Sequence, residues 1–368
     1  MPSFDIVKEI TAGKSFKIEQ VKSGFDLQTD HITEHFKGDI AIEGKDWNIG
    51  LIVGRSGTGK TTIAKEVFPK SFSEPHIYGS GSIIDEMPEA KSYKEITKTF
   101  TSVGFSSPPS WLKPYHVLSN GEKMRVDLAY AIMSDADPIL FDEFTSVVDR
   151  DIAKICSYAI SKSVRKMGKK FIAVSCHDDI IDWLEPDWVY DTNSQSYSFR
   201  GYQKTRPDIK IDIFRTEGDK NTLWKIFGKY HYLSPSLNNG THQYVGYYEG
   251  KPVCHCGILQ VPIRPGHRRI HRLVVLPDYQ GVGIGTQFIT FLGELYKKIG
   301  IHIDLITSSP ALLNGLQKTQ CWVLIRAGRS TGNTKALSHI ARGGGQSLID
   351  NSSHKRVTYS FRYIGDKE

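Results

Sequence analysis

The chain has 368 residues, of which 39% are hydrophobic and 24% charged, and it contains no low-complexity tract. This length favours two domains, because a single hydrophobic core stops growing at roughly 250 to 300 residues. The composition excludes a mainly disordered chain, and no stretch approaches the roughly 18 apolar residues that cross a bilayer, so we expect a cytoplasmic protein without a membrane partner.

The net charge of +7 is unevenly distributed along the chain. Residues 1–205 hold 25 Lys and Arg against 29 Asp and Glu, whereas residues 206–368 hold 22 against 11. A basic half favours a polyanionic partner such as nucleic acid, although the same charge also suits the phosphates of a nucleotide-like cofactor or a solvated surface. We expect nucleic acid as the partner of the second half.

The five cysteines are an odd number scattered along a long chain, which does not indicate a disulfide framework. The triplet Cys254-His255-Cys256 offers metal-binding side chains, but it lies in the strand-like run PVCHCGILQV. Because no second Cys/His pair stands at zinc-site spacing, we do not expect a metal there.

The first chemical motif is a glycine-rich loop between a buried strand and a helix. The apolar run 49–53 leads into GRSGTGKTT and then into the helical pattern IAKEVF. This is the spacing G-x-x-x-x-G-K-[ST], in which backbone N–H groups surround nucleotide phosphates at a helix N-terminus. In such a loop the lysine reaches the β- and γ-phosphates and the following threonine binds Mg²⁺. The predicted ATP-binding residues are Gly54, Ser56, Gly57, Thr58, Gly59, Lys60, Thr61 and Thr62.

Four further segments follow this loop in a fixed order. They read LSNGE at 118–122, PILFDE at 138–143, SVVD at 146–149, and FIAVS at 171–175 just before a histidine. In this order they resemble the signature loop, Walker B strand, D-loop and switch histidine of the ABC ATPase family. One departure is Asn120, which replaces the first glycine of the signature pair.

The resemblance to ABC ATPases implies specific roles and a partner. Asp142 would support Mg²⁺ together with Thr61, Glu143 would polarise the attacking water, and His177 would contact the γ-phosphate. Ser119 and Gly121 would cap the γ-phosphate of ATP held by another protomer, so the resemblance implies a homodimer joined through an ATP sandwich.

Residues 62–117 contain no glutamine for the family's Q-loop, so that ligand stays unassigned, with Ser106 and Ser107 as the candidates to replace it. This interval is also short for a transporter ATPase, which favours a switch or clamp such as the ABC proteins of DNA maintenance. The adenine-stacking aromatic residue stays open among Phe25, Phe36 and Trp47.

A polar, proline-containing stretch, KTRPDIK, follows a last expected strand at 196–202. We therefore divide the chain into domains 1–205 and 206–368. The second part opens with an expected strand at 211–216 and a helix at 219–233. A hairpin then follows, whose turn is predicted at Glu249-Gly250.

The most informative segment of the second half is RLVVLPDYQGVGIGTQF, in which an apolar strand runs through a glycine-rich loop into a helix. It resembles motif A of the GNAT superfamily, Q/R-x-x-G-x-G/A. A dinucleotide-binding fold uses a similar loop, but no acidic residue that would read the ribose of NAD follows here. The resemblance implies that loop amides bind the pyrophosphate of acetyl-CoA or another acyl-CoA, that the strand edge bonds the pantetheine arm, and that a downstream asparagine contacts the cofactor. These residues are Leu273, Val275, Gln280, Gly281, Val282, Gly283, Ile284, Gly285, Thr286 and Asn314.

The groups that would move protons are harder to identify. Many GNAT enzymes carry a general-acid tyrosine in the helix after the next strand, but the segment SSPALLNGLQKTQCW has none. His231 or His271 could accept the nucleophile's proton at neutral pH, and we select His231 as the catalytic candidate. The alternative is that the run Tyr230-His231-Tyr232 serves only packing.

The sequence therefore predicts an α/β protein in which a P-loop NTPase domain of ABC type precedes a GNAT α+β domain with a mixed, mostly antiparallel sheet. Our first hypothesis is an ATPase fused to an N-acyltransferase that acts on or at nucleic acid, with a loose similarity to phage Mom-type DNA-modifying GNAT proteins. The second is a nucleic-acid-binding ATP clamp with a non-catalytic GNAT fold, and a transport subunit is the third. The basic residues proposed to follow a nucleic-acid backbone are Arg326, Arg329, Lys335, Arg342, Lys355, Arg356 and Arg362.

Overall fold

The computed structural model describes residues 3–11, 13, 15–25, 31–72, 75–201, 209–216, 218, 220–231, 236–262, 264–329 and 357–365. The chain forms two compact units, one from Met1–Tyr78 with Lys123–Pro207 and the other from Gly79–Glu122 with Asp208–Glu368. The chain leaves the first unit for the last time after Pro207, two residues beyond the boundary predicted after residue 205. Gly79–Glu122, which the sequence places in the first domain, packs with the second unit. The functional division at residue 205 stays a prediction.

The first unit is built on a five-stranded sheet in the order β4-β5-β3-β6-β7, in which only β7 is antiparallel to its neighbour. Every residue of β3 and β5 is buried, as expected for parallel strands covered on both faces. The strands are β3 (Ile49–Val53), β4 (Ile139–Phe141), β5 (Phe171–Ser175), β6 (Trp188–Asp191) and β7 (Ser196–Phe199). The helices are α2 (Lys60–Val67), α6 (Arg150–Met167), α7 (Ile180–Leu184) and the part of α5 (Asn120–Met133) that follows Glu122.

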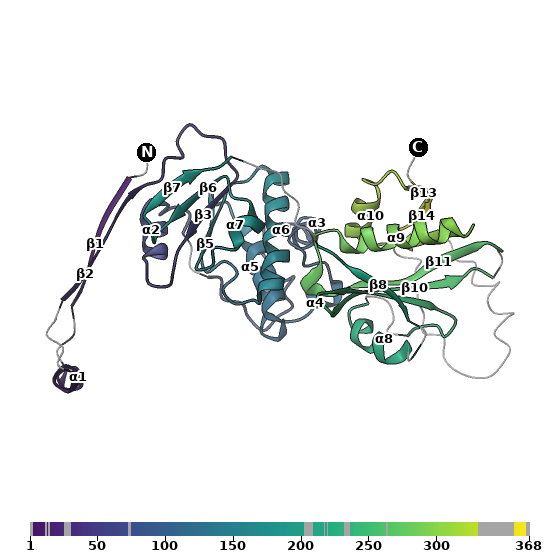
Figure 1. Cartoon of the computed structure of the whole chain (residues 1–368), viewed down its shortest axis with the longest axis horizontal. Coiled ribbons are helices and arrows are strands. Elements are labelled where there is room, and N and C mark those ends of the chain that lie inside the picture. The colour runs from purple at the N-terminus through teal and green to yellow at the C-terminus, as the bar shows by residue number, and fades with distance from the viewer. Residues whose placement is uncertain are drawn as a thin grey trace. The chain divides into compact units, whose positions relative to one another are not determined.

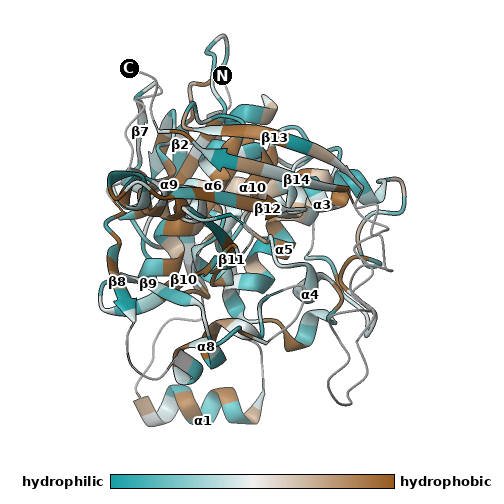
Figure 2. Cartoon of the chain, turned by 90° about the vertical axis from the view of Figure 1, so that its right-hand side faces the viewer, coloured by the Kyte–Doolittle hydropathy of each residue, from teal (hydrophilic) through white to brown (hydrophobic). Residues whose placement is uncertain are grey.

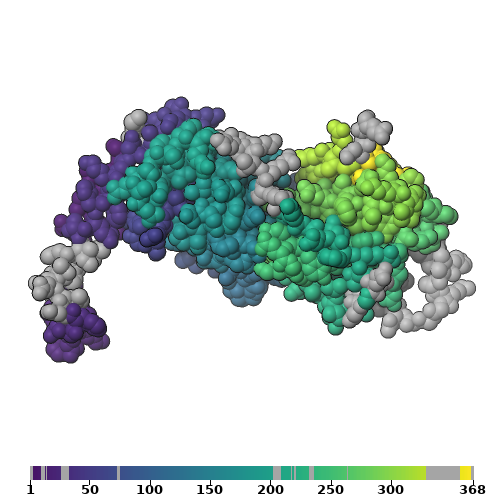
Figure 3. Space-filling model, viewed as in Figure 1, coloured from purple at the N-terminus to yellow at the C-terminus, as the bar shows by residue number. Residues whose placement is uncertain are grey.

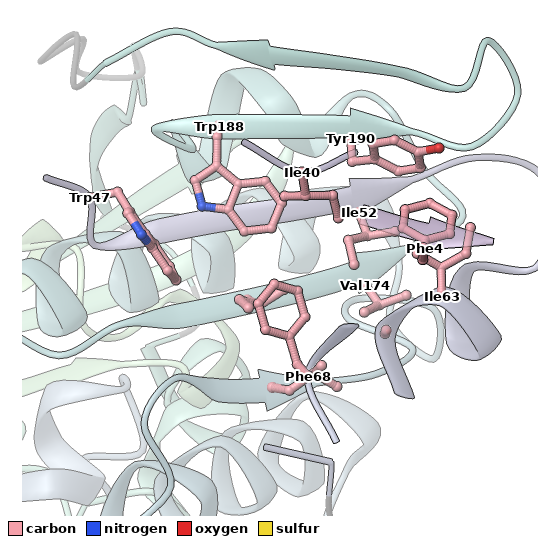
Figure 4. Packing of buried hydrophobic residues seen from close by; sticks show 12 residues of the cluster. Phe4, Ile40, Trp47, Ile52, Ile63, Phe68, Val174, Trp188 and Tyr190 are labelled. Atoms are coloured by element: carbon pink, nitrogen blue, oxygen red, sulfur yellow. The ribbon is translucent and has the colours of Figure 1, made fainter. Parts of the chain in front are cut away.

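Aromatic side chains fill the core of this unit (Figure 4). Trp188 is fully buried, meets Trp47 edge to face at 5.6 Å between ring centroids and stacks with Phe68 at 6.3 Å. Tyr190 in turn meets Phe4 edge to face. These contacts fix β6, which pairs with β3, the strand from which the glycine-rich loop departs.

An antiparallel ribbon precedes the sheet in the chain and consists of β1 (Ser3–Thr11) and β2 (His31–Asp39). Between them lies α1 (Phe16–Phe25), which buries none of its described side chains. Figure 2 shows hydrophobic and hydrophilic residues alternating along α1, and Figure 3 shows its atoms, dark purple, uncovered on the side facing the viewer.

The second unit contains a seven-stranded sheet in the order β13-β14-β12-β11-β10-β9-β8. All neighbouring strands are antiparallel except β11 and β12, which confirms the predicted mixed sheet. In Figure 1, α9 and α10 lie on one side of this sheet and α8 on the other. The strands are β8 (Asp212–Thr216), β9 (His242–Tyr248), β10 (Lys251–Gln260), β11 (His267–Val275), β12 (His302–Thr307), β13 (Trp322–Arg329) and β14 (Val357–Tyr363). The helices are α3 (Tyr93–Ser102), α4 (Pro108–Trp111), η1 (Tyr115–Val117), α8 (Lys220–Gly228), η2 (Pro277–Tyr279), α9 (Ile284–Lys298) and α10 (Pro310–Leu316).

Local turn chemistry explains the β9–β10 hairpin. Glu249 and Gly250 both have left-handed backbone angles, with φ of 48° and 78°. Two such residues in succession make the tight turn that matches the twist of antiparallel strands. The predicted turn is therefore confirmed, whereas the helix expected at 219–233 ends earlier, at Gly228.

Candidate functional site

The first candidate site begins where β3 leaves the sheet. β3 lies between β5 and β6, and α2 starts at Lys60, directly after the glycine-rich loop. Lys60 is 8% exposed, and its Nζ atom donates to the Arg55 carbonyl oxygen at 2.7 Å. The buried ammonium group therefore lies against the loop itself, at the positive end of the helix dipole of α2.

Two glycines in this loop have no room for a side chain. A Cβ atom on Gly54 would stand 2.0 Å from the Thr192 hydroxyl oxygen, which itself lies 2.5 Å from the Thr58 hydroxyl. A Cβ atom on Gly59 would stand 2.4 Å from the ring of Phe36. The loop is thus held closely by β6 on one side and by the β2 aromatic residue on the other. Of the three adenine-stacking candidates, Phe36 is the one shown beside the loop, whereas Trp47 is 5% exposed in the core and Phe25 lies on α1.

The two residues predicted to hold Mg²⁺ contact each other. Thr61 donates its hydroxyl hydrogen to Asp142 Oδ2 at 2.8 Å. Asp142 follows β4, and its other carboxylate oxygen accepts a hydrogen bond from the Glu143 backbone at 2.9 Å. Glu143 is exposed and has a left-handed φ of 52°, so the turn presents its carboxylate to solvent beside the aspartate.

His177 lies at the same edge of the sheet. It follows β5, and its backbone N–H donates to the Ser175 hydroxyl at 3.2 Å. Because β4, β5 and β3 are parallel neighbours, the residues after their carboxyl ends share one edge. That edge therefore carries the glycine-rich loop, the Asp142-Glu143 pair and His177.

Ser119 and Gly121 lie at the start of α5, in the segment that packs with the second unit. The Ser119 backbone N–H donates to Glu122 Oε2 at 3.1 Å, and the Glu122 N–H donates back to the Ser119 hydroxyl at 3.2 Å. This reciprocal capping orders the helix start, while the Ser119 and Asn120 side chains stay exposed.

The second candidate site is an opening between two parallel strands. β11 and β12 pair from His267 with His302 up to Ile270 with Leu305. Beyond these pairs β11 continues to Val275, and its edge toward β12 makes no further pairing in the described strands. The carbonyl oxygens of His271 and Val275 already accept hydrogen bonds from Arg272 Nη1 and Gln280 Nε2, at 3.1 and 2.8 Å, so an extended ligand would bond the remaining backbone groups of this edge.

The loop after β11 leads to the N-terminus of α9. Gly281 and Gly283 have φ of 90° and 96°, and Gly283 caps α9. Left-handed residues at a helix start turn backbone N–H groups toward a common point, which is the arrangement that binds an anion. Gly285 brings α9 close to β11, since a Cβ there would stand 3.2 Å from Val275.

α10 supports the same helix start. A Cβ atom on Gly315 would stand only 2.4 Å from the Thr286 hydroxyl oxygen, so α10 approaches the first turn of α9 closely. Asn314 is exposed on α10 immediately before this contact. The structure thus brings the predicted asparagine to the helix that follows the glycine-rich loop.

The motif implies that the backbone of Gln280 helps to bind pyrophosphate, but the Gln280 side chain makes contacts that the motif does not imply. Its Nε2 donates to the Val275 carbonyl oxygen at 2.8 Å, and its Oε1 accepts from the Ser106 backbone N–H at 2.9 Å. The side-chain amide therefore bridges β11 and the Gly79–Glu122 segment.

His231 lies three residues beyond α8, with its ring 6.1 Å from that of Trp224. Trp224 also contacts His255, which is fully buried and bonds Gln243 Oε1 at 2.9 Å through Nε2. Burial, and to a smaller extent the His231 charge, lowers the pKa of His255 to about 4. The sequence indicated His255 only as part of a possible metal triplet and did not predict its contacts with Trp224 and Gln243.

Strand alternation places His255 on the opposite face of β10 from its two neighbouring cysteines. Burial raises the pKa of Cys254 to about 12, so its thiol stays protonated. In the described part of the chain no cluster of three or more His, Cys, Asp and Glu side chains is arranged to hold a metal ion.

His271 is the first residue of β11 beyond the pairing with β12. Burial, and to a smaller extent the positive charges of Arg272 and Arg269, lowers its pKa to about 4. Its imidazole is therefore neutral at pH 7.

The predicted basic surface is only partly described. Arg326 is exposed on β13. Arg362, in contrast, makes two hydrogen bonds to Asp304, at 2.8 and 3.2 Å, so its guanidinium is already paired within the sheet. Lys335, Arg342, Lys355 and Arg356 lie outside the described residues, as do Tyr232 and the side chain of Arg329.

Comparison with known proteins finds two kinds of similarity in this chain. The family model described as Acetyltransferase (GNAT) family matches residues 206–312. Over 103 residues the chain is 34% identical to a probable ATP-binding cassette sub-family F member 3 homolog of Encephalitozoon cuniculi, covering 27% of this chain and 18% of that protein. One part of the chain thus matches the GNAT acetyltransferase family model, and part of the chain is similar to ATP-binding cassette proteins.

A second relative, a putative ABC transporter ATP-binding protein of Listeria monocytogenes, is 24% identical over 211 residues, covering 45% of this chain and 77% of that protein. A solved acetyltransferase of Bacillus subtilis in complex with CoA is 19% identical, with a TM-score of 0.32 over 42% of this chain and 98% of its own. This chain spans less than a fifth of the length of the Encephalitozoon cuniculi relative. None of the helices in the described part of the chain combines the length and apolar character that a membrane span requires.

Proposed function

We propose that this chain hydrolyses ATP at residues 54–62 and transfers an acyl group from acyl-CoA to an amine, acting on or at nucleic acid. The observation that carries this proposal is a pair of glycine-rich loops, each between the end of a strand and the start of a helix, which we interpret as two phosphate cradles. One ends at Lys60 and the other at Gly283. Both cofactors belong to the cytoplasm, where we place the protein.

The residues of the first cradle fit ATP and Mg²⁺. When bound, this pair would supply a transferable γ-phosphoryl group whose charge the metal neutralises. Lys60 and the loop amides would hold the phosphates, the contacting Thr61 and Asp142 would hold the metal, and Glu143 would orient water. Ser119 and Gly121 would cap the γ-phosphate in a second copy of the chain, which gives a homodimer through an ATP sandwich.

The residues of the second cradle fit the diphosphate and pantetheine arm of acetyl-CoA or another acyl-CoA. When bound, it would supply an activated carbonyl, whose C–S bond breaks as an amine nitrogen bonds to the carbon and gives up one proton. The unpaired edge of β11 at Leu273 and Val275 would align the arm, and the amides from Gln280 to Thr286 would bind the diphosphate. We assign proton acceptance to His231, because an imidazole side chain can act as a base near neutral pH. Its ring lies beside that of Trp224, beyond the end of α8.

Nucleic acid is the preferred acceptor or platform because the second half carries a net charge of +11. The exocyclic amine of a base is an acceptor that an N-acyltransferase could modify. The loose similarity to Mom-type DNA-modifying proteins favours such an acceptor. Arg326 supports this surface, whereas the pairing of Arg362 with Asp304 removes one of its expected members.

The test is mass spectrometry of nucleosides and proteins from cells that express the parent chain or Gly283→Val. A side chain at residue 283 is strained because its φ is 96°, so the variant should lose the product. An acyl mass on a nucleoside that disappears in the variant supports the proposal. Acylation confined to proteins would contradict action on nucleic acid.

The second candidate function is an ATP clamp on nucleic acid whose GNAT fold does not catalyse. The absence of tyrosine from residues 308–322 favours it, because this segment then supplies no general-acid tyrosine to the leaving thiolate. Calorimetry with acetyl-CoA separates the two functions. Binding without any acylated product favours the clamp, and no binding at all removes the acyltransferase.

A further inference from the structure

The Gly79–Glu122 segment contacts the glycine-rich loop of the GNAT region directly. Both belong to the same compact unit. The Ser106 backbone N–H donates to Gln280 Oε1 at 2.9 Å, and α3 packs against α10, the helix that supports the start of α9. The segment that carries the signature loop is therefore also part of the support of the predicted acyl-CoA site.

Gln280 is fixed at both ends of its side-chain amide. Its Nε2 bonds the carbonyl oxygen of Val275, the last residue of β11, so the amide spans the start and the end of the turn that leads to Gly281. If Ser106 moves, Gln280 must move or give up a hydrogen bond. Either change alters the direction of the loop amides that follow.

A continuous set of buried contacts links Ser106 to the signature loop. The peptide group between Phe105 and Ser106 is planar and rigid, and its carbonyl oxygen accepts from Trp111 Nε1 at 2.9 Å. The neighbouring Ser110 donates its hydroxyl hydrogen to Glu122 Oε1 at 2.7 Å. Glu122 is 5% exposed, and its second oxygen accepts the Ser119 N–H.

The Ser119 N–H is the point at which nucleotide would act. A phosphate that takes this donor removes it from Glu122 and places negative charge beside a buried carboxylate. The carboxylate then depends on Ser110 for a hydrogen bond, so the contacts that reach Ser106 change. This gives the segment two arrangements that a ligand can select between.

We propose that Gln280 is a positioning residue through which nucleotide at Ser119 controls the affinity of the glycine-rich loop for acyl-CoA. This inference rests on the proposed function, since it requires that both loops bind their phosphates. Coupling between two sites is reciprocal, so acyl-CoA changes the affinity for ATP by the same factor.

The experiment measures the Kd of acetyl-CoA by calorimetry on the full chain carrying Glu143→Gln, which slows hydrolysis, with and without ATP and Mg²⁺. We expect ATP to shift this Kd by about tenfold. In Ser106→Pro, which lacks the N–H donor, the shift should disappear. Ser106→Ala keeps the N–H and should keep the shift.

Ser110→Ala provides a second interruption that leaves the backbone unchanged. Ser102→Ala is its control, because the Ser102 hydroxyl donates to the Thr99 carbonyl oxygen within α3. A shift that is lost in the Ser110 variant and kept in the Ser102 variant supports the proposal. A shift below twofold in the parent, or one that is equal in all variants, overturns it.

Titrations with one ligand at a time distinguish a failure of the proposed function from a failure of the coupling. If the parent fails to bind acetyl-CoA or ATP alone, the proposed function and the coupling are both wrong. If both ligands bind, the chain dimerises with ATP and neither ligand changes the affinity of the other, only the coupling is wrong. A chain that binds both ligands and stays monomeric with ATP contradicts the ATP sandwich of the proposed function.

Discussion

Thr61 and Asp142 are joined by a hydrogen bond of 2.8 Å although 81 positions separate them in the chain. Thr61 lies in the first turn of α2, and Asp142 lies directly after β4. Each is placed by a buried strand, so the pair does not depend on flexible loops for its alignment. A hydroxyl and a carboxylate at this distance are suited to share one hard divalent cation.

We predict that Asp142→Asn lowers Mg²⁺-dependent ATP hydrolysis on the order of 100-fold, because the amide keeps the shape of the side chain but not its charge. Phosphate release under steady-state conditions measures this loss. Asp46→Asn removes the same charge from an exposed residue three positions before β3, at the opposite edge of the sheet, and should keep activity. Unchanged hydrolysis in the Asp142 variant would exclude it as a metal ligand.

Phe36→Ala should weaken ATP binding about tenfold, because stacking of a base on an aromatic ring contributes roughly 1–3 kcal/mol. The Phe36 ring borders Gly59, whereas Phe25 lies on α1 and is exposed. Equilibrium titration with a fluorescent ATP analogue gives the affinity. Phe25→Ala should bind as the parent does, and the opposite ranking of the two variants would assign the base to Phe25.

Gly315→Ala should destabilise the second unit by about 1–3 kcal/mol and weaken acetyl-CoA binding, because the new methyl group would overlap the Thr286 hydroxyl. Adding Thr286→Ala removes that oxygen while it keeps the backbone N–H. The double variant should therefore recover most of the affinity. Calorimetry on both variants decides, and a double variant as weak as the single one would show that this contact does not set the position of α9.

The buried His255 predicts a pH dependence of stability. Its pKa is about 4 in the folded protein against 6.5 when exposed, so below pH 6.5 the unfolded chain gains a proton that the folded chain does not. Stability should therefore fall by about 3 kcal/mol between pH 7 and pH 4 from this group alone. Hydrogen exchange of peptides covering residues 243–257 measures the change locally.

The matched variant is His255→Gln, which cannot titrate but can still bond Gln243. It should lose about 3 kcal/mol less than the parent over the same pH range. If both proteins lose the same amount, His255 is not held neutral by burial.

Much of the fold followed from local patterns in the sequence. The strand, loop and helix around Lys60 and the turn at Glu249-Gly250 were predictable, because apolar runs, glycine positions and turn residues act over a few neighbours. The mixed sheet of the second unit also followed from the motif that contains Gly283. These signals are independent of the rest of the chain.

Long-range placement could not be read from the same patterns. The bond between Ser106 and Gln280 joins residues 174 positions apart, and neither has a sequence feature that marks the other. The pairing of Arg362 with Asp304 similarly depends on the register of β12 with β14. The contact of His255 with Gln243 could not be predicted either, because the two residues are adjacent only across the hairpin. The roles assigned to the site residues stay predictions.

The division of the chain into units also bears on how its activities can be dissected. A fragment that begins at residue 206 would lack Gly79–Glu122 and would expose the surface that this segment covers. A fragment that ends at residue 205 would carry the same segment without its packing partner. Truncation would therefore damage both halves, and single substitutions in the intact polypeptide are the sounder way to silence one half and observe the other.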